Sequence, residues 1–443
     1  MNSKSILRLA VPSIVSNITV PLLGLCDVTI MGHVGGATHI GAIAVGSMIF
    51  NVIYWLFGFL RMATSGLTAQ AYGYYSKIDD GRENKEYRHP TPHSILHQSL
   101  LMALSIALLI VLLQVPLKWF TFYLMHPTAD VARLCTPYYY ICVWGAPAML
   151  GLYALTGWFI GMQDTRTPMF IAIGQNIVNI GTSLLLVVVF HLGIVGVALG
   201  TLIAQWVGFL AALTAVAHKY KEPVLPSSFS VCFSQTTSNL NSQFSILKSL
   251  RLYLDIFLRT LCLVAVNFYF TAAGAAQGAD ILAANTLLMQ LFTLFSYVMD
   301  GFAYAGEALA GRYYGAHDMP LLHLTVRLLF RWGIIMVVVF TAVYWLGGTS
   351  FLRLLTTDDT VIATAAHYMP WAILIPVAGM AAFVWDGVFI GITASRGMLW
   401  SCLIAAIAFF AIQLSLSPSL ANHALWLALL VYLALRGVVQ TII

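Results

Sequence analysis

The sequence has few charged residues. Of its 443 residues only 8% are Asp, Glu, Lys or Arg, and 60% are hydrophobic, whereas soluble domains carry about 25% charged residues. The mean hydropathy is +0.87. This balance excludes a soluble globular protein and predicts an all-α protein that crosses a lipid bilayer several times.

The sequence also lacks the short motifs of common enzyme sites. It has no Gly-rich phosphate loop, no H-E-x-x-H and no G-x-S-x-G at a strand-turn-helix. Its six cysteines show neither a metal-ligand spacing nor a disulfide framework. We therefore expect no enzyme activity, no cofactor and no metal. The sequence also has no nucleotide-binding domain. If the protein moves a solute across the membrane, an ion gradient would therefore supply the energy.

Apolar runs of about 18 or more residues predict twelve membrane-spanning helices. They lie near residues 6–31, 40–64, 95–124, 135–162, 168–190, 193–217, 252–274, 281–310, 322–347, 360–392, 397–416 and 422–442. Lys and Arg gather in the loops on one side, Arg436 among them, which predicts that both termini are cytoplasmic. The net charge of +5 is then a topology signal rather than a nucleic-acid interface.

Two short motifs recur along the chain. The segment GWFIG at 157–161 returns as GVFIG at 387–391, an offset of 230 residues, and QAYG at 70–73 resembles RYYG at 312–315, an offset of 242. The unequal offsets indicate that about twelve residues are missing between the two motifs in the second half. An even number of spans per half predicts a parallel repeat of two six-helix bundles. We expect lobes at 1–217 and 251–443, joined by a cytoplasmic linker at 218–250.

Asp27 is the first candidate functional residue, because a carboxylate in a membrane-spanning helix normally faces a bundle interior or a water-filled cavity. Its helix also contains Pro12 and Pro21, which can bend or swing it. Protonation of Asp27 would then shift the balance between a bent and a straight form. The alternative is an Asp that caps the helix or bonds a nearby Asn, with no part in a transport cycle.

Polar residues on the fifth predicted span are expected near Asp27. Asn176 and Asn179 share one helix face, and Ser183 follows at i+4 from Asn179. Asn17 lies roughly on the face of Asp27 and extends the polar strip. Helix-to-helix hydrogen bonding alone would also explain the amides.

The second half carries its own polar residues. Asp255 and Arg259 are spaced for an i, i+4 ion pair, which favours a structural contact over a gate. Asp300, Glu307 and Asp386 could neutralise a cationic substrate or carry protons, or could instead pair with Arg259.

Four stretches in order carry a resemblance to a known family. They are PLLGLCDVTIMGH at 21–33, FLRMATSGLTAQAYG at 59–73, MDGFAYA at 299–305 and WDGVFIG at 385–391. Together they resemble the multidrug and toxic compound extrusion (MATE) transporters, in the branch of DNA-damage-inducible protein F. The resemblance implies two six-helix lobes arranged as a V.

The resemblance also implies roles for particular residues. Asp27 matches the first-helix acid that is proposed to be protonated, Pro12 matches the bending proline, and Asn176 and Asn179 match the amide positions of the fifth helix. Ser183 stands where many relatives carry a second acid, so Asp27 would act as the sole protonation site of the first lobe.

The function expected on these grounds is cation-coupled antiport, with protons favoured over sodium. The substrates would be organic, cationic or amphiphilic compounds exported across the inner membrane by a monomer. The alternative is a flippase for a lipid-linked or amphiphilic precursor, which would require a basic cavity; only Arg61 and Arg259 are expected inside. A channel or scaffold is the third possibility.

Overall fold

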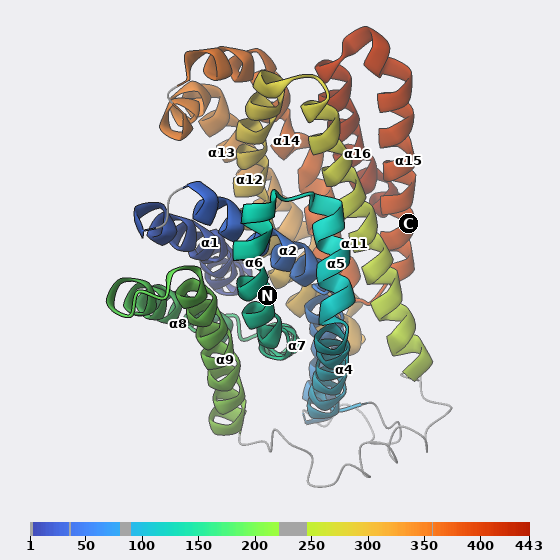
Figure 1. The fold of residues 1–443 in the computed structure, drawn as a ribbon. Helices are drawn as coiled ribbons and strands as arrows, with labels where there is room; N and C mark the ends of the chain where they lie inside the picture. The colour runs from blue at the N-terminus through green and yellow to red at the C-terminus, as the bar shows by residue number, and fades with distance from the viewer. Residues whose placement is uncertain (1–2, 35–36, 80–89, 221–245, 357) are drawn as a thin grey trace. The chain divides into compact units, whose positions relative to one another are not determined.

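The computed structural model describes residues 3–34, 37–79, 90–220, 246–356 and 358–443, and these residues are almost entirely helical (Figure 1). The helices of the first half are α1 (Ser3–Val34), α2 (Ala37–Leu56), α3 (Phe59–Asp79), α4 (Pro92–Leu112), α5 (Gln114–Met125), α6 (Ala129–Cys142), α7 (Ala146–Gly161), α8 (Arg166–Leu184) and α9 (Gly193–Tyr220). Those of the second half are α11 (Ile246–Ala275), α12 (Ala279–Gly315), α13 (Met319–Leu355), α14 (Asp359–Gly391), α15 (Ser395–Leu420) and α16 (Asn422–Ile442).

Eleven segments of the described chain are long and apolar enough to cross a membrane. Each overlies one of the predicted spans, and α1 corresponds to the first predicted span. The helical structure of the second predicted span, at 40–64, extends beyond residue 64, because α3 continues to Asp79. The reason is that Tyr74 is 7% exposed and packs within the protein, so this turn of the helix is not a solvated loop.

The helices form two compact units, one comprising residues 1–14 with 251–443 and the other residues 15–250. These units differ from the expected lobes at 1–217 and 251–443 in that residues 1–14 group with the second half. The reason is local packing: Gly301 of α12 lets the backbone of α1 approach at Ala10 and Ile14. The two units thus divide α1 between them, two residues after Pro12. Most of the expected linker at 218–250 lies outside the described residues.

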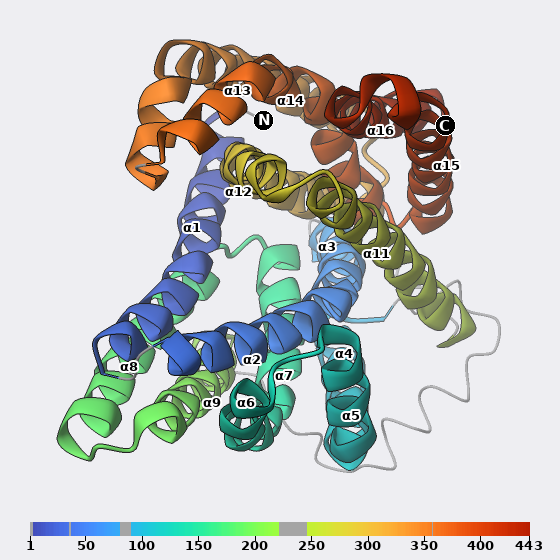
Figure 2. The same cartoon turned by 45° about the horizontal axis from the view of Figure 1, so that its top comes forward.

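The two units repeat the same helix pairing. In the unit at 15–250, α7 packs against α3, α4 and α9, and α8 packs against α9; in the other, α14 packs against α12, α13 and α16, and α15 packs against α16. Figure 2 shows the last pair side by side near the C-terminus. A single helix, α13, takes the place of α4 and α5, whose break precedes Pro116.

Glycine contacts show that the repeat extends to the register of the helices. A Cβ on Gly161 would lie 2.8 Å from the carbonyl oxygen of Ser65, and one on Gly391 would lie 2.7 Å from that of Glu307. The glycines are 230 residues apart and their partners 242. The twelve missing residues therefore fall between these markers, where α3 and α4 are separated by residues 80–91 but α12 and α13 only by 316–318.

Candidate functional site

Asp27 lies on α1 in the unit at 15–250 and is 4% exposed, as expected for an acid in a membrane-spanning helix. One carboxylate oxygen, Oδ2, accepts a hydrogen bond from the Thr201 hydroxyl at 3.3 Å. The other, Oδ1, is buried and has no hydrogen-bond partner among the described residues. A buried acceptor without a donor is costly, so this oxygen is suited to holding a proton or contacting a cation.

Thr201 of α9 joins Asp27 to α8. The Asn179 amide donates to the Thr201 hydroxyl at 3.1 Å, and that hydroxyl donates onward to Asp27. Sequence reasoning placed Asn179 near Asp27 but missed the threonine that connects them. The signal was present, since Thr201 and Gln205 are polar residues four apart within an apolar stretch of this helix.

Asn176 makes a helix-to-helix hydrogen bond, the alternative given above for the two amides. Its amide donates to the backbone carbonyl of Thr19 at 2.8 Å. This bond fixes α8 against α1 two turns before Asp27. Asn17 is half-buried and takes part in a polar or aromatic contact.

Ser183 is fully buried against Gly200, where α8 and α9 are in close contact. Its hydroxyl, like Oδ1 of Asn179, has no partner in the described part of the chain. Directly after it, α8 ends and a π-helical segment follows at Leu185–Val189. Such segments are common next to functional sites because they re-aim side chains.

The Asp27 cluster, defined as Asp27, Asn179, Ser183 and Thr201, therefore contains one acid and three neutral oxygen-bearing side chains. The hydrogen bond that Asp27 accepts comes from a neutral hydroxyl rather than from a cation. Chemically, such a cluster can take up a proton on the carboxyl group or surround a small bare cation with oxygen atoms.

The buried acid of the other unit is held differently. Asp386 of α14 pairs with Arg259 of α11 and with Arg436 of α16, the latter at 2.5 Å, and Oδ1 accepts from Gln440 at 2.7 Å. Of the two alternatives for Asp386, pairing with Arg259 is the arrangement in the structure. Arg436 is 5% exposed inside the last span, so its expected place in a cytoplasmic loop is wrong.

The expected ion pair between Asp255 and Arg259 does not form. Asp255 instead accepts from the Ser395 hydroxyl at 2.7 Å, and Arg259 turns to Asp386. Helical spacing permitted the pair, but α14 supplies a partner for Arg259 and α15 one for Asp255. The role of Asp255 in the structure is to hold α11 against the start of α15.

The remaining predicted acids lie on α12. Glu307 is 1% exposed and Asp300 is half-buried, and both have interactions with other residues. Arg61 on α3 is buried and also has a partner. These residues stay candidates for the polar network of their units.

A second polar cluster lies outside the spans, where α7 connects to α8. Asp164 accepts from Lys219 at 2.6 Å and from the hydroxyl and backbone amide of Thr167 at 2.6 and 3.2 Å. Burial raises the pKa of Asp164, but these hydrogen bonds outweigh it and hold the pKa below 3.8. Asp164 is therefore ionised at neutral pH and ties this connection to the end of α9.

A duplicated set of membrane-spanning helices that buries acidic side chains is typical of a membrane carrier. The MatE family model matches residues 12–185 and 256–418. The chain belongs to the MATE family of multidrug and toxic compound efflux transporters. Membership in this family confirms two predictions. The protein is a transporter rather than an enzyme, and it is a multi-pass protein of the inner membrane.

Relatives and solved structures agree with this assignment. The chain is 37% identical to DNA damage-inducible protein F of Escherichia coli (strain K12), over 98% of this chain and 90% of that protein. It is 23% identical to the probable multidrug resistance protein NorM of Acinetobacter baylyi, over 91% and 86%. The fold matches a crystal structure of MATE in the bent conformation, with a TM-score of 0.84 and 16% identity, over 100% of this chain and 94% of that one.

Proposed function

We propose that this protein is a proton-coupled antiporter that exports organic, cationic or amphiphilic compounds across the inner membrane by alternating access. The observation that supports it most directly is Asp27, buried in the spans and bonded through one oxygen to a neutral hydroxyl. A carboxylate in this setting lacks the counter-charge that would hold it permanently ionised. Protonation and deprotonation of Asp27 would then accompany each cycle.

The proposed conformational element is α1. Its residues 3–14 belong to one unit and the rest to the other. Pro12 and Pro21 each remove a backbone donor inside this helix, which lowers the cost of bending it. A change in the charge of Asp27 would alter the hydrogen bond to Thr201 and so the position of α1 against α9.

Sodium is the second candidate coupling ion, and one observation favours it. The unpartnered oxygens of Asn179 and Ser183 could serve as ligands beside Asp27. Hard cations prefer about six oxygens, however, and this cluster has a single carboxylate. We therefore keep protons as the proposed coupling ion.

The pairing of the buried arginine residues argues against the flippase. A diphosphate-bearing lipid requires free basic groups, and Arg259 is already paired with Asp386.

We also propose that the protein is a monomer with twelve spans and that both of its termini are cytoplasmic. Asp300, Glu307 and Asp386 would be structural or substrate-facing rather than coupling groups.

The test is dye efflux from proteoliposomes under an imposed pH gradient or, separately, a sodium gradient. Asp27→Asn keeps the size and the hydrogen-bonding shape of the side chain but cannot ionise. We expect transport driven by the pH gradient to fall at least tenfold, and the sodium gradient to have no effect on the wild type.

Ser395→Ala is the matched control, because it removes a buried polar contact in the other unit without touching Asp27. It should retain most of the activity. Equal pH-driven export by wild type and Asp27→Asn would refute the assignment of Asp27. Export that follows the sodium gradient alone would refute the choice of ion.

A further inference from the structure

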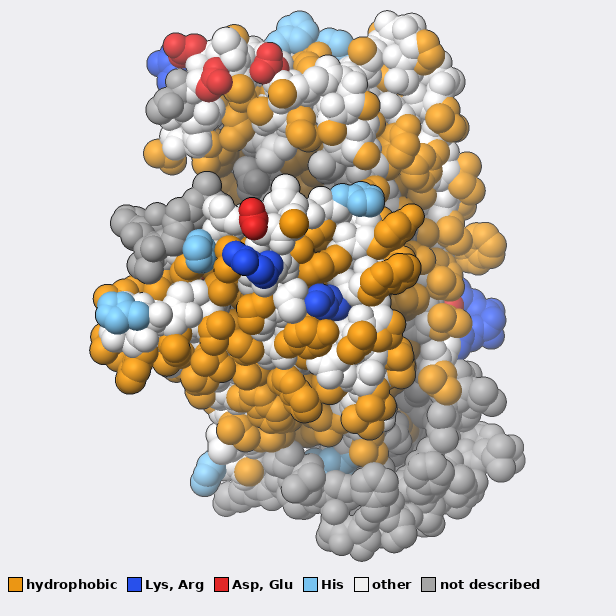
Figure 3. All heavy atoms as spheres, viewed as in Figure 1, with side chains coloured by type: hydrophobic (Ala, Val, Ile, Leu, Met, Phe, Trp, Pro, Cys, Tyr) orange, Lys and Arg blue, Asp and Glu red, His pale blue; other side chains and the backbone are white. Residues whose placement is uncertain are grey.

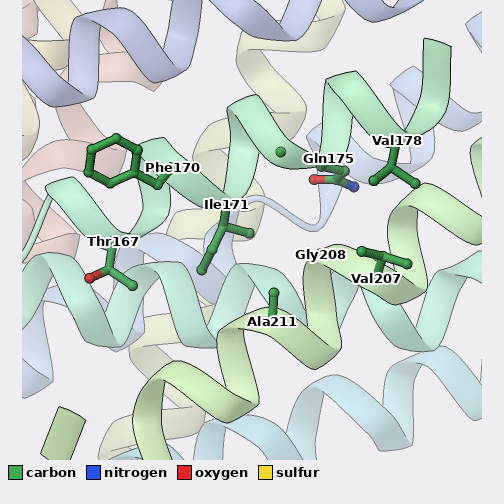
Figure 4. Close-up of a pocket in the computed structure, with 9 residues that line it drawn as sticks. Thr167, Phe170, Ile171, Gln175, Val178, Val207, Gly208 and Ala211 are labelled. Atoms are coloured by element: carbon green, nitrogen blue, oxygen red, sulfur yellow. The ribbon is translucent and has the colours of Figure 1, made fainter. Parts of the chain in front are cut away.

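A groove runs between α8 and α9 on the surface of the unit at 15–250 (Figure 4). Its volume is about 330 Å³. The walls are apolar side chains, with Phe170, Ile171 and Val178 on α8 facing Val207 and Ala211 on α9. Figure 3 shows that hydrophobic side chains cover much of the visible face over these two helices. The groove therefore has the character of a binding site for a hydrocarbon chain.

Two glycines create the hollow. A Cβ on Gly174 would meet no atom within 4 Å, so this position opens into the groove. Gly208 stands opposite, where a Cβ would lie 3.1 Å from the Gln175 side chain. Gln175 itself donates to the sulfur of Met149 on α7. Its amide is therefore directed at least in part toward α7.

The depth of the groove matches one leaflet of a bilayer. Its lining on α8 extends from Thr167 to Val178, which at 1.5 Å per residue is roughly 16 Å. The hydrocarbon core of a membrane is about 30 Å thick. Since α8 and α9 are both candidate spans, the groove would run from one membrane surface to about the midplane. A lipid acyl chain fits this length, whereas a spanning helix does not.

The mouth of the groove is positively charged. Arg166, the first residue of α8, is exposed, and Lys219 in the last turn of α9 is half-exposed. Asp164 offsets one of these charges through its contact with Lys219. Thr167 belongs both to the groove and to this cluster, because Lys219 donates to its hydroxyl at 3.2 Å. The sum of the three charges is positive, which suits a lipid phosphate.

We propose that this groove binds one acyl chain of an anionic phospholipid, with the lipid phosphate against Arg166 and Lys219. The lipid would be a bound component of the transporter rather than its cargo. Its site is separate from the Asp27 cluster, so the proposal does not depend on the coupling ion. Binding at Thr167 and Lys219 would also contact the connection between α7 and α8.

Photo-crosslinking of the full-length protein tests this site. Phe170, which is 66% exposed in the groove wall, is replaced by p-benzoylphenylalanine. The protein is placed in nanodiscs that contain equal amounts of phosphatidylglycerol and phosphatidylcholine. We expect about fivefold more phosphatidylglycerol adduct, the preference that one basic side chain near a membrane surface provides.

Three variants in this background locate the lipid. Arg166→Gln should abolish the preference for phosphatidylglycerol, and Gly174→Leu should reduce all lipid adducts about tenfold by filling the groove. Gly181→Leu is the matched control: it lies on the same helix, a Cβ there also meets no atom within 4 Å, and it is outside the groove. It should leave the adducts unchanged.

Several results would overturn the proposal. One is equal labelling of the two lipids that Arg166→Gln does not change. Another is an adduct with residues 221–245 or with a second copy of the chain instead of lipid. Equal losses in Gly174→Leu and Gly181→Leu would also overturn it. If Gly174→Leu does not elute as a folded protein, Arg166→Gln, which alters only an exposed side chain, still decides the question.

Discussion

Each unit buries an acid inside its duplicated helices, Asp27 in one and Asp386 in the other, and these two acids have opposite kinds of partner. Asp27 is bonded to the neutral hydroxyl of Thr201, whereas Asp386 pairs with Arg259 and Arg436. Elsewhere in the two units the helix contacts correspond, since Gly161 and Gly391 meet α3 and α12 in the same register. The two acids lie on helices that do not correspond in the repeat, Asp27 on α1 and Asp386 on α14.

The difference indicates a division of labour. A carboxylate between two guanidinium groups gains ion-pair energy that it would lose on protonation, so it is suited to a fixed structural role. A carboxylate beside neutral donors can change its charge without leaving a buried cation unpaired. This contrast supports Asp27 rather than Asp386 as the coupling residue, and four predictions test it.

The largest effect on stability is expected for Asp386→Asn. The substitution leaves Arg259 and Arg436 buried without a counter-charge, and breaking a buried pair in this way costs about 3–5 kcal/mol. Asp27→Asn should change the free energy of unfolding by less than about 1 kcal/mol, since the hydrogen bond that Asp27 accepts comes from a neutral hydroxyl. Denaturant unfolding in detergent measures the free energy of unfolding of both variants. Equal decreases would contradict the proposed difference between the two acids.

The next effect concerns the glycines that the two units have in common. Gly161→Ala and Gly391→Ala each place a Cβ less than 3 Å from backbone atoms of the facing helix. Backbone atoms shift less readily than the ends of side chains. Each of the two substitutions should therefore destabilise the protein by about 1–3 kcal/mol. Gly174→Ala is the control with open space and should be neutral. A large difference between the two variants would show that the units are packed less alike than their register suggests.

A smaller effect is expected for Thr201→Val, which removes the hydrogen bond to Asp27 and keeps the volume. A hydrogen bond inside a membrane protein averages about 0.6 kcal/mol, which corresponds to roughly a threefold decrease in pH-driven transport. Thr201→Ser restores the hydroxyl and should recover the rate. Unchanged transport in the valine variant would show that Thr201 takes no part in coupling.

The smallest effect is expected for Asp164→Asn at the connection between α7 and α8. Its partner Lys219 is 53% exposed, so the loss should stay below about 1 kcal/mol. Because the pKa of Asp164 is lowered in the folded state, its contribution is complete above its unfolded pKa of about 3.9 and disappears only as the pH falls through the lower folded value. Stability curves of variant and wild type should therefore stay parallel from pH 5 to 8, and a gap that changes there would contradict this account.

Much of the framework could be predicted from the sequence because its signals are local or periodic. Long apolar runs marked the spans, and the glycine motifs at 157–161 and 387–391 gave an offset that the helix contacts reproduce. The cost of an exposed carboxylate in a membrane predicted that Asp27 is buried, which is confirmed. Its role in coupling stays a prediction.

Partner choice could not be predicted in this way. The spacing of Asp255 and Arg259 allowed an ion pair, but Ser395 and Asp386 come from helices more than a hundred residues away. Thr201 and Arg436 were overlooked for the same reason, since their importance depends on the helices that face them.

The sequence by itself determined that the chain spans a membrane, that its halves repeat and that one acid lies inside the first of them, because hydrophobicity and helical period act along the chain. Only the tertiary structure decided which buried acid meets arginines and which meets a threonine. The physical reason is that charge pairing in a membrane interior depends on distances between helices, and neighbouring helices in space need not be neighbours in sequence.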